Sequence, residues 1–418
     1  MIPRSKSMAA MLMLGVLMLA SPALCPSKAV AQSEQQKDDP ETAAKRRRAL
    51  DFYRQGRYVD ALPLLEELSI SHPNDFVLKE HWAYCMLEYS ATLGDPEKRK
   101  QARLQARNTA LEAQRLGDQS DLLQVLLSIP ADGAEAKFSD RADVNEGMKT
   151  AEAEFARGNL DKARDGYKHV LELDPNNYDA TLFVGDVYFK EHAYNSAGEW
   201  FGKAVKMNPA RETAYRYWGD ALASAGKNDE AREKYIGAVI AEPYNRAPWA
   251  ALRTWADRVK QPFNAIILQN KSSVTKKDKE VVITLDEHSL KSGDPEMAGW
   301  LAYSGVRATW QSEKFKKEFP NEPTYRRSLK EETEALHTMV EVLAPEAASK
   351  KTAEKLDPTL LELVQIDHEG LLQSFVLLNR ADPEIAKDYP AYRDAHPDKL
   401  YRYVDEFVLP KTGASTTK

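Results

Sequence analysis

Acidic residues and histidines form three short groups that could support acid–base chemistry or bind a metal ion. Asp367, His368 and Glu369 are consecutive, and His337 and Glu341 stand four residues apart. Neighbouring residues on a helix point in different directions, so the consecutive group would need ligands from elsewhere in the chain. His337 and Glu341 would share one helix face, where a salt bridge or hydrogen bond is the simpler interpretation. Asp286-Glu287-His288 follows an expected strand and is interpreted as a turn.

The motifs of the common enzyme classes are absent from the sequence. It contains no HExxH, no GxSxG, no Walker loop and no GxGxxG. We therefore expect no catalytic, cofactor-binding or metal-binding residues, and no cofactor. A hydrolase with its site in the C-terminal third is kept as the alternative function.

A pattern recurs every 34 residues in the middle of the chain. Each copy has an alanine, an aromatic residue four positions later and a proline twelve positions after the alanine. Small residues let two helices cross closely, the aromatic residue fills the space beside the crossing, and proline ends the second helix. The three copies are Ala163, Tyr167 and Pro175; Ala197, Phe201 and Pro209; and Ala231, Tyr235 and Pro243.

The period and residue types of these copies resemble the tetratricopeptide repeat (TPR). Clear repeats are expected at 42–75, 144–177, 178–211 and 212–245, with a degenerate repeat after the first and a capping helix after Pro243. The resemblance implies a mainly α fold, a right-handed superhelix of helix pairs over 44–260. Such repeats do not catalyse; they form a concave surface that binds another protein.

In TPR proteins the first helix of each repeat lines the concave face, and the residue after the crossing Gly or Ala points into it. By this resemblance Glu152, Asp186 and Asp220 form an exposed acidic ladder, and Phe155 and Phe189 face inward one turn later. Acids and aromatics together suit a basic or apolar segment of a partner protein. The alternative is that each carboxylate is bonded locally within its repeat.

The N-terminus resembles a secretory signal peptide. Arg4 and Lys6 precede the apolar run 9–20, which is too short to span a bilayer, and Ala29-Val30-Ala31 fits a cleavage site. The alternatives are an uncleaved anchor and lipidation at Cys25, although Leu24 is larger than a lipobox prefers. An exported protein, periplasmic or extracellular in a bacterium, is expected, with no integral membrane span after cleavage.

The net charge and the cysteine count of the chain bear on its partners and on its disulfides. Loss of Arg4, Lys6 and Lys28 with the signal would change the formal net charge from −6 to −9, which disfavours nucleic-acid binding. Only Cys85 would remain, so no internal disulfide can form, and its neighbours indicate a small buried hydrophobe. Residues 32–43 are polar and are expected to be a flexible leader.

The C-terminal third, 261–408, is expected to be a mostly α-helical domain with a small β-hairpin, and it resembles no family that we name. Strands are expected at 263–269 and 280–285, joined by 270–279. Helices are expected at 297–319, at 325–343 and at 401–408. A further helix is expected to begin after Asp357, which would be its N-cap. Leu409 to Gly413 matches LPxTG, the sorting signal of cell-wall-anchored proteins. Such a signal requires a hydrophobic segment after it, and none follows here, so 409–418 is interpreted as a frayed tail.

The sequence therefore predicts an exported TPR scaffold that binds another protein and is not an enzyme. A lipoprotein-like factor in envelope assembly is a further alternative, and the oligomeric state is left open.

Export should remove the first 31 residues, so Gln32 should be the first residue of the mature protein. N-terminal sequencing or intact mass of the protein from its native host measures this. A mass that retains Cys25 with an added lipid would contradict the cleavage site and establish a lipoprotein.

Overall fold

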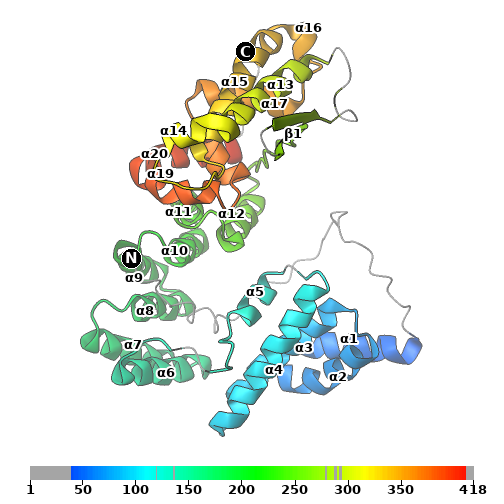
Figure 1. Ribbon diagram of the computed structural model, residues 1–418. Helices are drawn as coiled ribbons and strands as arrows, with labels where there is room; N and C mark the ends of the chain where they lie inside the picture. The colour runs from blue at the N-terminus through cyan, green and yellow to red at the C-terminus, as the bar shows by residue number, and fades with distance from the viewer. Residues whose placement is uncertain are drawn as a thin grey trace. The chain divides into compact units, whose positions relative to one another are not determined.

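The computed structural model describes residues 39–118, 120–134, 137–277, 280–286, 290 and 294–410. Several of the expectations fall outside these residues. They concern the signal peptide with Cys25, the leader up to Asp38, Glu287-His288, and the tail after Pro410. The chain divides into two compact units, one ending at Ala193 and the other beginning at Tyr194, and helices build both (Figure 1).

Paired helices make up the first unit. Successive helices pack against each other within α1–α4 and within α6–α8. Leu65, Leu78 and Trp82 belong to its N-terminal core, together with Cys85, which is fully buried as expected. Burial raises the pKa of the Cys85 thiol to about 12. The helices are α1 (Pro40–Arg54), α2 (Tyr58–Ser71), α3 (Phe76–Thr92), α4 (Pro96–Arg115), α5 (Asp121–Leu127), α6 (Ala142–Ala156), α7 (Leu160–Leu173) and α8 (Tyr178–Lys190).

Aspartates define where several of these helices begin. The side chains of Asp39, Asp75 and Asp95 accept hydrogen bonds from backbone N–H groups in the first turns of α1, α3 and α4. The cap at Asp39 places residues 40–43 inside α1. The expected flexible leader, 32–43, is therefore wrong over its last four residues.

The turn between the two helices of a repeat requires a left-handed backbone. Gly56, Gly158 and Gly226 adopt φ angles of 72°, 78° and 76° there, which glycine reaches without steric strain. His192 stands at the corresponding place in the repeat 178–211 and has a φ of 58°. The fold imposes this conformation on a non-glycine residue, because the 34-residue spacing leaves no other position for the turn.

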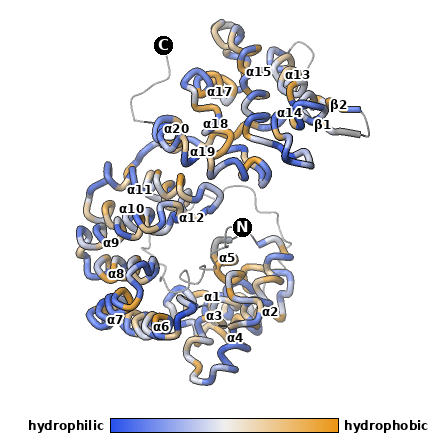
Figure 2. Tube along the Cα trace, turned by 60° about the vertical axis from the view of Figure 1, so that its left-hand side comes forward, coloured by the Kyte–Doolittle hydropathy of each residue, from blue (hydrophilic) through white to orange (hydrophobic). Residues whose placement is uncertain are grey.

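The second unit begins with three more repeat helices and continues into the C-terminal helices. Apolar stretches (orange in Figure 2) run along α17 and α18, where Leu363, Ile366 and Phe375 are fully buried. The elements are α9 (Tyr194–Met207), α10 (Glu212–Ser224), α11 (Asn228–Ala241), α12 (Arg246–Val259), β1 (Ser272–Lys277), β2 (Glu280–Leu285), α13 (Pro295–Thr309), α14 (Phe315–Glu318), α15 (Leu329–Ala348), α16 (Lys350–Ala353), α17 (Pro358–His368), α18 (Leu372–Phe375), α19 (Tyr389–Ala395) and α20 (Pro397–Tyr403).

Most expected C-terminal helices are present. A π-helical turn, Trp310–Lys314, joins α13 to α14, so helix runs from 295 to 318. The expected helix from Tyr325 begins later, at Leu329, because the Ser328 side chain caps it by accepting from the Glu331 N–H. Asp357 caps α17 as expected.

One hydrophobic core spans the expected boundary at 260. Tyr235 and Trp255 from the repeat helices and Tyr403 from α20 belong to the same cluster of buried residues. Arg232 on α11 donates to the Asp405 carboxylate at 2.7 Å, and Tyr389 donates to the Ile240 carbonyl at 2.5 Å. The C-terminal helices therefore cover the end of the repeats, a role that the sequence indicated for α12.

The segment after the last helix is held in place. Leu409 is fully buried, and its carbonyl accepts from Arg232 at 2.6 Å. The Gln261 side chain donates to the Pro410 carbonyl at 2.6 Å. The expectation of a frayed tail is therefore wrong at 409–410, because the apolar side chain and the carbonyls of this segment have partners.

The hairpin uses a different first strand from the expected one. β1 pairs antiparallel with β2, with Ser272 opposite Leu285 and Lys277 opposite Glu280. The predicted strand 263–269 was wrong, since it is not part of the sheet. Its carbonyls have other donors: Asn379 donates to the Ile266 carbonyl at 3.0 Å and Arg380 to the Leu268 carbonyl at 2.9 Å.

Ala197 on α9 is fully buried, and α9 packs against α10. We expect Ala197→Leu to lower the free energy of unfolding by roughly 1–3 kcal/mol, because three extra carbons must enter a filled crossing. Chemical denaturation of the purified protein measures the change. The exposed Ala250 on α12 offers the control, Ala250→Leu, and equal stabilities of the two variants would contradict the repeat register.

Candidate functional site

The first helices of the repeats carry the five residues predicted to contact a partner. Glu152 and Phe155 lie on α6, Asp186 and Phe189 on α8, and Asp220 on α10. Glu152 and Asp186 are buried, with exposed fractions of 9% and 6%. Phe155, Phe189 and Asp220 are partly buried.

Tyrosine hydroxyls satisfy two of the three acids. The Tyr167 hydroxyl donates to Glu152, and the Tyr235 hydroxyl donates to Asp220 at 2.6 Å. In both pairs the tyrosine follows the acid by fifteen residues, from the first helix of a repeat to the second. Burial raises the pKa of Glu152 to about 7, partly offset by the Tyr167 bond, and burial also raises the pKa of Asp220.

The expectation of an exposed acidic ladder is wrong for Glu152 and Asp186. The aromatic residue that fills each helix crossing is a tyrosine in two repeats, and a buried hydroxyl requires an acceptor. The acid after the crossing residue provides it, so the local alternative accounts for Glu152 and Asp220. A binding role for the five residues stays a prediction.

A pocket of about 550 Å³, which was not predicted from the sequence, lies among α9, α10 and the start of α11. Trp218 forms part of its wall. A Cβ at Gly198 would lie 2.9 Å from Trp218 Nε1, and one at Gly202 would lie 3.1 Å from Trp218 Cη2. The signal in the sequence was this pair of glycines four residues apart, one helix before a tryptophan.

Lysines surround this pocket, which we call the Trp218 pocket. Lys203, Lys206 and Lys227 line it, with Glu199 and Glu230. The Lys234 ammonium lies 4.3 Å from the centroid of the Trp218 ring, within range of a cation–π interaction.

The candidate acid–base residues are spread over the surface and paired. His337 Nδ1 lies 2.9 Å from an Asp367 carboxylate oxygen, and His337 Nε2 lies 3.7 Å from Glu341. The His368 side chain is 87% exposed, and Glu369 pairs with Arg402 at 3.2 Å. The expected pairing of His337 with Glu341 is present, and Asp367 is an additional partner. Among the residues that the structure describes, no three His, Cys, Asp or Glu side chains are placed to hold a metal ion.

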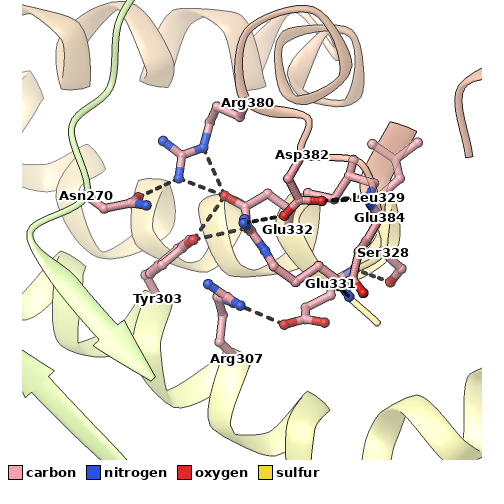
Figure 3. A network of polar contacts seen from close by, with 12 residues as sticks. Asn270, Tyr303, Arg307, Ser328, Leu329, Glu331, Glu332, Arg380, Asp382 and Glu384 are labelled. Carbon is pink, nitrogen blue, oxygen red and sulfur yellow. Dashed lines mark hydrogen bonds and ion pairs between the residues drawn. The ribbon is translucent and has the colours of Figure 1, made fainter. Parts of the chain in front are cut away.

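A buried ionic network occupies the C-terminal helices (Figure 3). Arg380 donates to the Glu332 carboxylate at 2.9 Å, and Tyr303 donates to it at 3.0 Å. Burial acts to raise the pKa of Glu332, but the guanidinium groups of Arg380, Arg327 and Arg307 outweigh it and hold the pKa below its usual value. Because these cations already match the charge of Glu332, the network supports the fold rather than acid–base chemistry.

Glu331 is the neighbour of Glu332 in the chain, but its pKa shifts in the opposite direction. Arg307 donates to its carboxylate at 3.0 Å and Tyr325 at 2.8 Å, yet burial raises the pKa of Glu331.

In the described part of the chain, no helix is long and apolar enough to cross a membrane.

The raised pKa of Glu152 predicts a dependence of stability on pH. Its stabilising contribution is complete below the ordinary value of 4.5 and is lost as the pH rises through about 7. Glu152→Gln stays neutral and keeps an acceptor for Tyr167. The variant should therefore gain about 3 kcal/mol over the wild type between pH 4 and pH 8. Denaturation at both pH values tests this, with Glu146→Gln, exposed on the same helix, as the control. Identical pH profiles for wild type and Glu152→Gln would contradict it.

Comparison with known proteins agrees with the repeat geometry. Residues 148–212 match the family model of the tetratricopeptide repeat. No curated protein matches the sequence. Among solved structures, the MamA protein is 17% identical, with 48% of this chain and 91% of that chain covered and a TM-score of 0.24.

Two further solved structures are similar to the same extent. YrrB, described as a TPR protein with an unusual peptide-binding site, is 14% identical, with 49% of this chain and 88% of that chain covered and a TM-score of 0.24. TTC0263, a thermophilic TPR protein in Thermus thermophilus, is 16% identical, with 51% and 98% covered and a TM-score of 0.24. At these identities and TM-scores the likeness identifies no function. The family model and the helix pairs together identify tetratricopeptide repeats at residues 148–212 of this chain.

Proposed function

We propose that this protein is an exported, non-catalytic scaffold that binds another protein through its repeats. The tetratricopeptide repeats at 148–212 are the observation that carries the proposal, because stacked helix pairs present side chains of successive helices to a partner. The export part rests on the sequence, on the basic start, the apolar run and Ala29-Val30-Ala31. The compartment proposed is the periplasm or the outside of a bacterial cell.

The residues predicted to line the groove have different roles within this proposal. Phe155 and Phe189 are partly exposed and offer apolar contact to a partner segment. Glu152 and Asp220 accept bonds from tyrosines and hold the two helices of a repeat in register. Apolar contact would therefore contribute more to the affinity than the acids do.

The positions of the acid–base candidates disfavour the hydrolase alternative. A catalytic site needs an acid or base that converges with other polar groups in a concave pocket. His337 instead pairs with Asp367 at the surface, and His368 is largely exposed. The envelope-assembly alternative differs from the scaffold in the identity of the partner and in its lipoprotein-like character.

The mature chain from Gln32, tagged and cross-linked in its native host, should recover one partner in a fixed ratio. That partner, once purified, should bind the purified mature chain in a titration. His337→Ala should bind equally well, because its side chain is paired at the surface and lies outside the repeats. A mature chain that recovers no specific partner would contradict the scaffold function, and loss of a hydrolytic turnover in His337→Ala would favour the hydrolase.

A further inference from the structure

One wall of the Trp218 pocket is apolar. Trp218 on α10 lies across Gly198 and Gly202 of α9, where an added Cβ would crowd the indole ring at 2.9 Å and 3.1 Å. Leu222 of α10 and Ala225, just after this helix, continue the lining. The absence of side chains at the two glycines thus leaves room for the indole and for the hollow beside it.

This pocket is separate from the surface predicted to bind a partner. The predicted residues lie on the first helices of the repeats, whereas α9 and α11, which flank the pocket, are second helices. Asp220, the predicted residue on α10, is not part of the lining. The pocket can therefore be tested without altering any of the five predicted residues.

The charged groups of the pocket are available to a ligand. Lys203, Lys206 and Lys227 are exposed, and none of them forms an ion pair with another residue in the described part of the chain. The Lys203 ammonium lies 3.8 Å from the centroid of the Trp200 ring, and Lys227 donates to Asn195 at 3.3 Å. Neither of these two contacts is with a carboxylate.

Positive charge exceeds negative charge at the pocket. Three lysines line it against two glutamates, Glu199 and Glu230. Lys234 beside Trp218 adds no net charge, because it lies 3.8 Å from the Glu233 carboxylate. The whole chain is acidic, with a formal net charge of −6. A locally cationic pocket on an acidic protein attracts anionic groups that the rest of the surface repels.

We propose that the Trp218 pocket binds an acidic peptide segment of the partner, with one large apolar side chain seated against Trp218 and flanking carboxylates paired with Lys203, Lys206 and Lys227. This inference rests on the proposed scaffold function and names the chemistry of its partner. The volume of about 550 Å³ accommodates one aromatic side chain and its flanking backbone, since pockets for small ligands start at about 300 Å³.

Three fluorescein-labelled hexapeptides test the proposal by fluorescence anisotropy with the mature chain. The first has one phenylalanine flanked by aspartates and glutamates. The second has lysines in place of the acids, and the third has alanine in place of the phenylalanine. The acidic phenylalanine peptide should bind more tightly than the other two, and its affinity should fall as salt is added.

Two variants locate the binding in the Trp218 pocket. Reversing two charges with Lys203→Glu and Lys206→Glu should weaken binding of the acidic peptide about tenfold, since two attractions become repulsions. Ala225→Phe should block it by filling the pocket, and this exposed position tolerates a larger side chain without loss of the fold. Lys316→Glu, a reversal of an exposed lysine on α14, is the matched control and should leave the affinity unchanged.

Each other outcome overturns the proposal. Preferential binding of the lysine peptide would assign the pocket to a basic partner, and equal binding of all three would show no charge selection. An acidic peptide that binds equally to wild type and to both pocket variants binds elsewhere. If the acidic peptide does not bind while the native partner still does, this inference fails and the scaffold function stands.

Discussion

The close approach of paired helices is the constraint on which the rest of this structure depends. At several crossings one helix presents a hydrogen where the other presents a bulky side chain. A Cβ at Gly219 would lie 2.9 Å from the Tyr235 ring, and one at Gly299 would lie 2.9 Å from Leu343. These distances are below van der Waals contact, so a larger residue would force the facing side chain or its helix to shift. The same device operates in the repeats and in the C-terminal helices.

Polar groups in the repeats follow from that packing. A tyrosine fills the crossing well because of its size, but it brings a hydroxyl into the interior. Glu152 and Asp220 accept from these hydroxyls, and burial then raises the pKa of both acids. The carboxyl groups that look like a binding ladder in the sequence are thus part of the helix contact. The three lysines that line the Trp218 pocket pair with no acid in the described part of the chain.

The C-terminal helices complete the protein by covering the last repeat. Arg232 connects α11 to Asp405 and to the carbonyl of Leu409, and the shared core runs on from Tyr235 to Tyr403. The charge of Glu332, buried among these helices, is matched by Arg380 and Arg327. A matched network stabilises one arrangement of helices without leaving its central carboxylate free for proton transfer.

The sequence by itself determined the repeat helices and their turns, because proline, glycine and the 34-residue spacing act over a few residues. It also located the cap at Asp357 and the buried Cys85, since both depend on neighbours in the chain. The tertiary structure decided which acidic side chains are buried against a hydrogen-bond donor and which charged side chains remain at the surface. Glu152 is fifteen residues from Tyr167, and only the folding of one helix onto the next brings the carboxyl group to the hydroxyl. The buried Leu409, which bonds to Arg232, likewise depends on a contact between distant segments. The pocket beside Trp218 depends on how three successive helices pack, which no local pattern encodes.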